Sequence, residues 1–515
     1  MTDAASRAAT GPYRAPGVAL RIDGAELDAV GVALLSRIRV RREASAPAAC
    51  ALTFEDPAAV GALAEILTLG AAVQARVEGF SGELFTGEIV SVDHAFAADG
   101  VPEITARCQD AAHRLRRDSQ LRVLVDVSVA EAARELASPA GLDIDAAEEG
   151  PRLPRVVQDG RSALDLLTSV TRHAGLWWRV DPSGRTLALF DDDHGVGEEV
   201  SVVYGQTLLQ ATVTVSALGN RSGWRVVGWD PVTGEVATGS ADADPVATGA
   251  TAGVYGGAMT AGPAHLDALA RGLTADDRAA SRSLRAVVHG DPVIGPGTTL
   301  VVEGLPAATS GSFRVLAADH VIDAFSGYTC TVTTAPPGHL RLLRRLDTAS
   351  GPEAAALTIA EVLRIDDPDG RGRVRVALSA YDGLESEWLP VLALGAGEAK
   401  GLALQPDVGD HVLVAHDIRD AGRGVVLGGL RTTDSGEPGV GVVDGAVGVY
   451  GLRLPTGQSL RMSAAGDRIV IGNREGSRVE LSDAGVIVHA EGDLVLAAPG
   501  HLLRLRAGRI ELEQA

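Results

Sequence analysis

The sequence predicts a mainly β, multidomain protein that ends in a repeat of short strands. Three observations lead to this prediction. Apolar and polar residues alternate over much of residues 1–120 and 196–335, five further apolar runs lie in 358–432, and glycines punctuate the last part of the chain at regular intervals. Alternation with a period of two is typical of strands that bury one face, and turn residues between the runs predict antiparallel connections.

The C-terminal repeat is the most regular feature. Its units begin at Gly485, Gly492, Gly500 and Gly508, and the last three units are eight residues apart. Aliphatic residues recur with the same spacing at Val486, Leu494, Leu502 and Ile510. Each unit is a short aliphatic run followed by a turn residue, and glycine supplies the positive φ of a tight corner. We therefore expect each unit to be one strand.

A single copy of this repeat is not expected to fold. The apolar side chains concerned are Val486, Val488, Leu494, Leu496, Leu502, Leu505, Ile510 and Leu512. Their burial cannot offset the backbone entropy of ordering a segment of this length, and every strand would have open edges. The repeat therefore predicts intertwined copies that share sheets, although the number of copies does not follow from it.

Length and composition set the class of protein. The 515 residues predict three or more domains, and a content of 46% hydrophobic and 22% charged residues is that of a soluble globular protein. No apolar run reaches the roughly 18–20 residues needed to span a bilayer. The first ten residues have neither the basic region nor the apolar core of a secretory signal. Cys50, Cys108 and Cys330 are few and far apart, so we expect no disulfide framework and synthesis in the cytoplasm.

The charge disfavours nucleic-acid binding. The formal net charge is −21, whereas proteins that bind nucleic acid need basic patches to neutralise phosphates. Residues 451–515 contain eight Asp or Glu and eight Arg, so the C-terminal repeat is neutral and the acidity lies before it. Solubility is the simplest explanation of that acidity.

The N-terminal part divides into three expected domains. Residues 1–120 form a first hub β-barrel with a short helix after Asp56-Pro57 and a hairpin turn at Ser81-Gly82. Residues 121–195 form an α/β insert with helices at 128–142 and 162–174, the first of which has a capping box at Ser128 and Glu131. The insert ends with a strand pair at 176–181 and 186–190.

The second hub β-barrel is expected at residues 196–335. Within it, the Gly/Ala-rich stretch 236–262 predicts a flexible loop, and residues 263–282 predict a helix. Residues 336–357 form a linker with three prolines. The five runs of 358–432 predict an oligonucleotide/oligosaccharide-binding (OB) barrel with a hairpin at Asp369-Gly370. A glycine-rich linker at 433–450 leads to the C-terminal β-prism at 451–515.

Two parts of the sequence carry a family resemblance. In the OB region the residues concerned are Asp367-Pro368, Gly372-Arg373-Val374, Trp388-Leu389-Pro390, Pro406, Gly409-Asp410 and Leu427-Gly428-Gly429-Leu430. In the N-terminal domains they are Leu84-Phe85-Thr86-Gly87, Gln109-Asp110, Leu115, Gly175-Leu176-Trp177 and Trp229-Asp230-Pro231. These stretches, the OB region most of all, resemble the spike proteins of contractile injection systems. That family includes the valine-glycine-repeat (VgrG) and antifeeding-prophage-like spikes and the fused hub and puncturing proteins of phage tails.

The resemblance implies a structural homotrimer. Its hub would dock on the inner tube and contact a hub adaptor and baseplate proteins, and its three C-terminal stretches would form a triangular β-prism capped by a PAAR-type tip protein. Such a spike touches the target membrane only transiently, and the particle that carries it can be released from the cell. About twenty residues separate Leu430 from the prism and the sequence ends at Ala515, so we expect neither an inserted lysozyme nor an appended effector.

No catalytic, cofactor-binding or metal-binding residue is predicted. The chain has one lysine, Lys400, and no P-loop, and it lacks the nucleophile-elbow and zinc-protease motifs. Asp366, Asp367 and Asp369 could form a calcium loop, but they lie where a hairpin turn is expected. Glu385 and Glu387 could be imagined as a glycosidase pair, but two positions apart they are better explained as solvated surface.

Two further residue sets have functional alternatives. His489 and His501 lie in the prism, where three symmetry-related imidazoles could bind a metal, although structural or surface roles are the simpler explanation. The tryptophans could be sugar platforms or core anchors, and at 3% aromatic content we favour the core; they are Trp177, Trp178, Trp224, Trp229 and Trp388.

The preferred hypothesis is therefore a structural spike. The alternative functions are a trimeric tailspike enzyme that degrades surface polysaccharide and a carbohydrate-binding OB module. Within the repeat, Arg504 falls where Leu496 and Leu512 point inward, so we expect a change of strand register near Leu502–Leu505 that keeps Arg504 off the prism axis.

Overall fold

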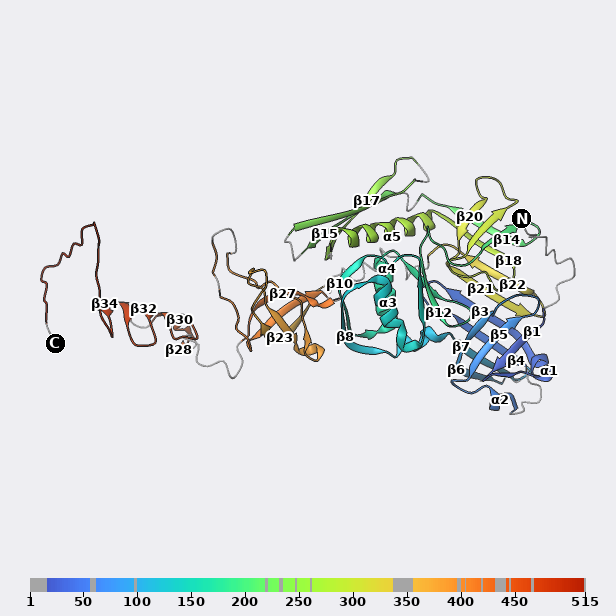
Figure 1. Ribbon diagram of the computed structural model, residues 1–515, viewed down its shortest axis with the longest axis horizontal. Coiled ribbons are helices and arrows are strands. Elements are labelled where there is room, and N and C mark those ends of the chain that lie inside the picture. Colours follow the sequence, from blue (N-terminus) through green and yellow to red (C-terminus); the bar gives the residue numbers. More distant parts are fainter. Residues whose placement is uncertain are drawn as a thin grey trace. The chain divides into compact units, whose positions relative to one another are not determined.

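The computed structural model divides the chain into two compact units, Met1–Gly429 and Leu430–Ala515 (Figure 1). It describes residues 16–513 except 56–61, 97–99, 218–220, 231–234, 246–247, 260–261, 337–354, 396–399, 403, 418–419, 431–440, 444–445 and 465–466. Residues 337–354 of the expected linker 336–357, much of the linker 433–450 and Pro231 thus lie outside the described residues, whereas residues 355–357 belong to a strand. Strands dominate both units, as predicted, and among the described residues no helix is long and apolar enough to cross a membrane.

The largest element of the first unit is an eleven-stranded sheet, ordered β14-β18-β22-β21-β3-β4-β7-β6-β5-β1-β2. Its strands are β1 (Val18–Ile22), β2 (Ala25–Glu26), β3 (Leu35–Glu43), β4 (Ala49–Glu55), β5 (Ala72–Val77), β6 (Phe85–Ala95), β7 (Glu103–Gln109), β14 (Leu208–Val215), β18 (Arg282–His289), β21 (Ala317–Asp323) and β22 (Gly327–Thr333). Two short helices, α1 (Ala29–Leu34) and α2 (Ala62–Ile66), accompany the first strands.

The two predicted hub modules share this sheet. Strand β21 pairs antiparallel with β3 from Ala317↔Glu43 to Asp323↔Arg37, so residues almost 280 positions apart in the chain are direct neighbours. Pairing satisfies the backbone groups of two strands that would otherwise be sheet edges. Separate cores lie on either side of the junction, one around Phe54 and Phe85 and one around Val288 and Phe313.

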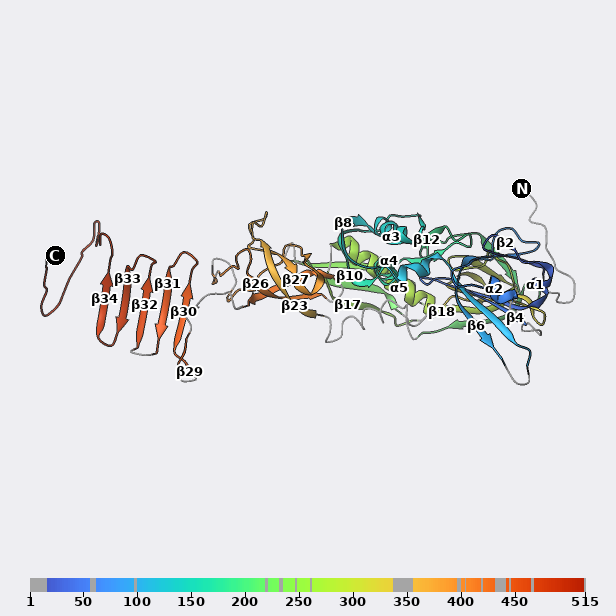
Figure 2. The same cartoon turned by 90° about the horizontal axis from the view of Figure 1, so that it is seen from below.

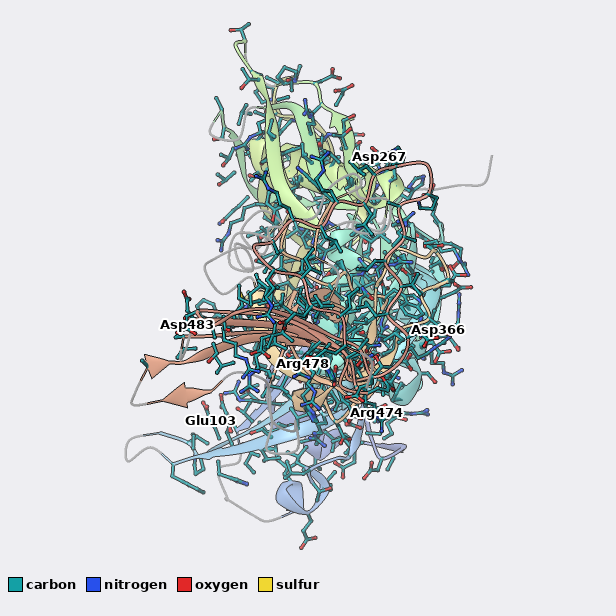
Figure 3. The ribbon with its side chains drawn as sticks, turned by 90° about the vertical axis from the view of Figure 1, so that its left-hand side faces the viewer. Glu103, Asp267, Asp366, Arg474, Arg478 and Asp483 are labelled. Carbon is teal, nitrogen blue, oxygen red and sulfur yellow. The ribbon has the colours of Figure 1, made fainter. Side chains whose placement is uncertain are left out.

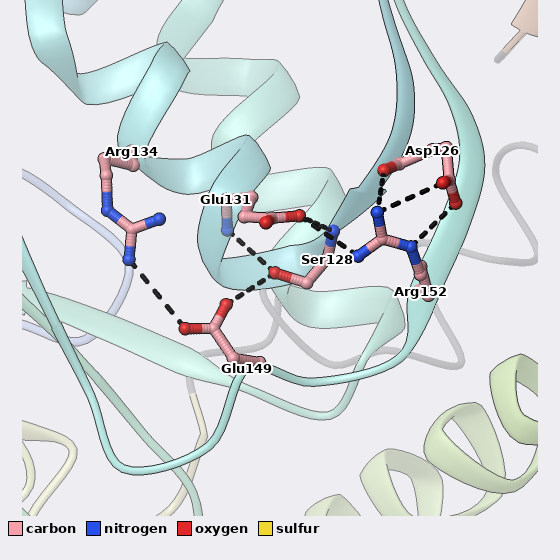
Figure 4. Close-up of polar contacts among 6 residues, drawn as sticks. All are labelled: Asp126, Ser128, Glu131, Arg134, Glu149 and Arg152. Atoms are coloured by element: carbon pink, nitrogen blue, oxygen red, sulfur yellow. Dashed lines mark hydrogen bonds and ion pairs between the residues drawn. The ribbon is translucent and has the colours of Figure 1, made fainter.

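The insert folds as its sequence predicts. Its strands are β8 (Ser119–Ser128), β9 (Asp143–Ala146), β10 (Arg152–Ser162), β11 (Trp177–Val180) and β12 (Thr186–Phe190), and its helices are α3 (Val129–Ala137) and α4 (Ala163–His173). The capping box is present, because the Ser128 hydroxyl accepts from the Glu131 N–H at 3.0 Å and the Glu131 carboxylate accepts from the Ser128 N–H at 2.7 Å (Figure 4). Gly141, at φ 73°, follows the helical segment.

The prediction of a flexible loop at 236–262 is wrong. Strands β16 (Glu235–Asp242) and β17 (Thr251–Met259) flank β15 (Arg221–Asp230) in a three-stranded sheet, against which the predicted helix α5 (Pro263–Ser281) packs. Glycine is needed here for close packing. A Cβ on Gly239 would lie 2.3 Å from backbone atoms of α5, and one on Gly253 would lie 2.7 Å from the Trp224 ring. Tertiary contacts therefore outweigh the low strand propensity of Gly and Ala.

A smaller sheet completes the second hub module. It contains β13 (Glu199–Val203), β19 (Thr299–Glu303) and β20 (Gly311–Arg314). Its inward-facing residues, which include Val202, Leu300 and Phe313, join the core of the second hub module.

The OB region forms a five-stranded sheet ordered β25-β24-β23-β26-β27. Its strands are β23 (Ala355–Arg364), β24 (Arg375–Leu378), β25 (Leu384–Glu385), β26 (His411–Asp417) and β27 (Asp420–Gly429). Four of these strands match four of the five apolar runs predicted in 358–432. The remaining run, 386–394, makes only isolated bridges, Val374↔Leu389 and Val391↔Val426, and β25 precedes it. Pro390 lies between these bridges and has no N–H with which to extend a ladder.

The second unit is an antiparallel meander that we call the ladder. It runs in chain order through β30 (Val449–Arg453), β31 (Ser459–Ser463), β32 (Arg468–Gly472), β33 (Arg478–Ser482) and β34 (Gly485–His489) (Figure 2). A separate hairpin of β28 (Val442–Val443) and β29 (Ala446–Val447) precedes it. Of the four predicted repeat units only the first is a strand, β34, and residues 490–513 contain no strand.

Candidate functional site

One face of the ladder consists entirely of apolar side chains, and we call it the apolar face. Two cross-strand rows form it. The first row is Leu452, Leu460, Ile471, Val479 and Val488, and the second is Tyr450, Met462, Ile469, Leu481 and Val486. Within every strand the two members are two residues apart, so both rows lie on the same side of the sheet.

The opposite face is mainly polar. It contains Arg461 on β31, Arg468 on β32, and Arg478 and Glu480 on β33, with Val449, Val470 and Ile487 as apolar exceptions. The Glu480 carboxylate is 2.7 Å from Arg468 and 3.5 Å from Arg478, and the hydrogen bond from Arg468 lowers the pKa of Glu480. Figure 3 shows Arg478 within the ladder, and Arg474 and Asp483 in the turns at opposite ends of the strands. The ladder is thus a two-sided sheet with one face suited to water.

The described residues leave the apolar face uncovered. Nine of its ten side chains are 36–69% exposed, and the tenth, Leu460, is half-buried. Among the described residues after Gly429, Val449 is the only buried hydrophobic residue. An open groove follows the first row and includes Leu494 from the next segment. An exposed apolar surface of this extent is typical of a protein–protein interface.

Residues 490–513 continue this exposure beyond the last strand. Their eight large aliphatic side chains are 52–94% exposed, with Leu512 the most exposed. The last ladder strand, β34, pairs only with β33, and its other edge is open. A strand needs a hydrogen-bonded neighbour, and the single chain supplies none to the last three repeat units. The expected register change near Leu502–Leu505 and the place of Arg504 therefore stay predictions.

The histidines of the repeat lie on exposed positions. His489 is in β34, and its Nε2 is 3.0 Å from the Glu491 carboxylate, whereas His501 follows Gly500 outside any strand. No group of three metal-ligating side chains occurs among the residues that the structure describes. A metal on a symmetry axis would need other copies of the chain, so that alternative stays a prediction.

The aspartates of the OB hairpin serve as turn residues. The Asp367 carboxylate accepts from the backbone N–H of Asp369, Arg371 and Arg373 and forms a 2.7 Å ion pair with the Arg373 guanidinium. These contacts, chiefly the Arg373 hydrogen bond, hold the pKa of Asp367 well below its usual value. Asp366 pairs instead with Arg364 at 2.8 Å, so the carboxylates of a calcium loop already have partners. The expected hairpin turn is thus present, and the calcium alternative stays a prediction.

The two glutamates considered as a glycosidase pair also have partners. The Glu385 carboxylate lies 2.8 Å from Arg375, and that of Glu387 lies 3.8 Å from Arg423. Their side chains are 48% and 27% exposed. Both are therefore partly solvated, as expected, but each also pairs with an arginine, which was not expected.

Three of the tryptophans are core anchors as predicted. Trp177, Trp178 and Trp224 are at most 4% exposed. Trp388 is only half-buried, and the guanidinium groups of Arg364 and Arg375 lie 5.5 and 5.4 Å from its ring centroid. The side chain of Trp229 lies outside the described part of the chain.

The regular glycine spacing marks only Val486 and Val488 among the ten residues of the apolar face, because the ladder begins four strands before that spacing. A different signal marks the face. Apolar residues two positions apart occur in every strand, as at Leu460 and Met462 or Ile469 and Ile471, with polar residues around most of them. That pattern predicts a strand with one buried face.

Comparison with known families identifies the OB region. Residues 358–430 match the family described as the Type VI secretion system/phage-baseplate injector OB domain. A second family, described as the Alg8 N-terminal domain, matches residues 70–324. No curated protein sequence is significantly similar to the chain.

Solved structures extend the similarity over most of the chain. An Escherichia coli component of the type VI secretion system, described as similar to the T4 bacteriophage tail proteins gp27 and gp5, is 14% identical over 80% of this chain and 99% of its own, with a TM-score of 0.52. A chain of the half-lidded Francisella PdpA–VgrG complex is 9% identical over 92% of this chain and 87% of its own, with a TM-score of 0.51. A chain of the lidded Francisella complex is 8% identical over 92% of this chain and 79% of its own, with a TM-score of 0.50. The resemblance to VgrG-type and phage-tail spikes is thus confirmed in the fold and in the OB domain.

Proposed function

We propose that this protein is the central spike of a contractile injection apparatus and that it acts as a homotrimer. The observation that carries the proposal is the uncovered apolar face of the ladder, in a chain that also contains an injector OB domain. Association of several copies would cover the ten side chains of that face and supply hydrogen-bonded neighbours to residues 490–513.

In this proposal the hub, the OB domain and the C-terminal prism have separate roles. The hub of the first unit docks on the inner tube and baseplate, the OB domain forms a neck, and the C-terminal prism bears a PAAR-type tip protein. Sheets shared among chains resist axial load, because many ladder hydrogen bonds must break together. The spike contacts the target membrane transiently during injection, and the particle can act outside the cell that makes it.

The proposed role is mechanical and not catalytic. Support comes from the partners of the candidate catalytic carboxylates, Glu385 and Glu387, both of which pair with arginines. The solved structures of similar fold include a component of the type VI secretion system and a chain of a PdpA–VgrG complex.

Light scattering coupled to gel filtration tests the oligomeric state directly. The full chain is expected to elute with the mass of three chains, and a chain that ends at Gly429 is expected to stay folded but to lose that stable association. A folded monomer of the full chain at micromolar concentration would disprove the proposal.

A further inference from the structure

A small cavity in the hub lies where four elements meet. Trp177 of β11, Asp276 and Arg278 of α5, Phe313 and Arg314 of β20, and Arg282 at the start of β18 are among its lining residues, with Asp191 and Asp192 beyond β12. Its volume is about 190 Å³. The cavity belongs entirely to the first unit and is separate from the ladder.

Each carboxylate that lines the cavity already has a side-chain partner. Asp276 is 2.6 Å from Arg172, a pair whose side chains are only 5% and 1% exposed. Asp192 is 2.9 Å from Arg278. Asp191 lies 3.2 Å from His194 and accepts from the backbone N–H of Asp193 and His194, and its proximity raises the pKa of His194.

Two arginines of the cavity have no such partner. Within the described part of the chain, no carboxylate lies within 4.0 Å of Arg282 or Arg314. Arg282 donates to the Ser310 carbonyl at 2.6 Å and lies 4.5 Å from the Phe313 ring centroid. Arg314 donates to the Gly297 and Asp192 carbonyls and to the Thr299 hydroxyl, and its Nε is buried without a hydrogen-bond acceptor.

The lining itself contains three arginines and three aspartates, but Arg172, from outside the lining, pairs with Asp276, so two guanidinium groups are left without a carboxylate. Partly buried guanidinium groups are costly unless an anion compensates them. The C-terminal end of α5 contributes only partial negative charge, and Arg278 in its last turn offsets that contribution. Guanidinium groups bind carboxylates and phosphates through paired N–H donors, so the missing partner is an oxyanion.

The size of the cavity limits the oxyanion. Water occupies about 30 Å³ per molecule in the liquid, so the cavity offers room for about six waters. That space accepts a phosphate ion or a carboxylate on a short chain, but it is smaller than the roughly 300–1,000 Å³ of sites for drug-sized ligands.

We propose that Arg282 and Arg314 form a binding site for a small oxyanion between α5, β18 and β20. Because Arg282 begins β18 and Arg314 ends β20, a bound anion would link these two elements of the hub. This site is independent of the proposed spike function.

Thermal unfolding of the full chain in inorganic phosphate tests the site, with acetate in a second series and potassium chloride of equal ionic strength as reference. We expect a saturable rise in the midpoint with a dissociation constant below about 1 mM, since a ligand that binds only the folded state stabilises it. A response to phosphate alone assigns the site to phosphate groups, and a response to both anions assigns it to oxyanions including carboxylates.

Variants separate this site from general ion effects. The double variant Arg282→Gln/Arg314→Gln is expected to lose the saturable response, whereas Arg271→Gln, which replaces an exposed arginine outside the cavity, is expected to keep it. Ser312 also lines the cavity, so Ser312→Glu is expected to raise the midpoint without added anion and to abolish the response. An absent response in the unaltered chain, or an equal response in the folded double variant, would overturn the proposal.

Discussion

The two units of this protein bury their apolar residues in opposite ways. The first unit has several cores of fully buried side chains, such as those around Phe54, Trp178 and Val376. The ladder has the same kind of alternating strands, but its apolar face is exposed to solvent, and Val449 is the only buried hydrophobic residue described there. The strands are alike in sequence pattern, and the difference lies in whether the chain provides a second layer.

This difference shows that an alternating pattern specifies a face but not what covers it. In the hub, helices and other strands of the same chain cover the apolar side. In the ladder none of the described residues of the second unit does so, and in the proposed spike other copies of the chain would provide the cover. Substitutions on the two units are expected to have different consequences, in assembly for the ladder and in folding for the hub.

The largest effect is expected from a charge on the apolar face. Ile471 is the middle member of the first row, so Ile471→Asp would place an unpaired carboxylate in the contact of every copy. We expect dissociation of the assembly to monomers by light scattering. Arg461→Asp places the same side chain on the opposite face and is expected to leave the mass unchanged. Equal masses for both variants would show that the apolar face is not the interface.

The next largest effect is expected in the hub, at the buried pair of Arg172 and Asp276. Asp276→Ala leaves the Arg172 guanidinium, which lies 3.4 Å from the Trp177 ring centroid, buried without its carboxylate. We expect a loss of about 3–5 kcal/mol in the free energy of unfolding. Tryptophan fluorescence in urea would measure it. Glu83→Ala removes an exposed partner of Arg76 and is expected to cost no more than about 1 kcal/mol.

A pH-dependent effect is expected in the OB domain. The folded-state pKa of Asp367 is depressed, chiefly by Arg373, so its contribution to stability is present above the unfolded pKa of about 4 and is lost as pH falls further. Asp367→Asn is expected to lower the thermal midpoint at pH 7 and to reduce its decline below pH 4. Asp366→Asn, at a 68% exposed neighbour, is expected to change both quantities much less.

The smallest effect is expected at the helix cap of the insert. Ser128→Ala removes the acceptor of the Glu131 N–H and the hydroxyl that donates to Glu149 at 2.6 Å (Figure 4). We expect a cost of about 1 kcal/mol in the free energy of unfolding. Ser128→Thr keeps the hydroxyl and is expected to behave like the unaltered chain, and equal losses for both variants would show that the hydroxyl is not responsible.

Part of the apolar face could be predicted from the sequence. The glycine spacing and the aliphatic residues near Val486 and Val488 predicted a repeat that cannot fold alone, and the structure leaves those residues 69% and 56% exposed. The earlier members of both rows were not predicted, because residues such as Tyr450 and Leu460 precede the regular glycines. Cross-strand register brings them onto the same face, and register is a property of paired strands rather than of one segment.

The sequence by itself determined the elements whose signals are local. The capping box at Ser128, the turn at Asp367 and the helix at 263–281 depend on residues a few positions apart, and each has the predicted form. Only the tertiary structure decided the rest. The strands at 235–242 and 251–259 exist because glycines there allow close approach of a helix and a tryptophan, and β21 pairs with β3 because both strands need a neighbour. Such choices depend on contacts between residues far apart in the chain, and no local pattern encodes them.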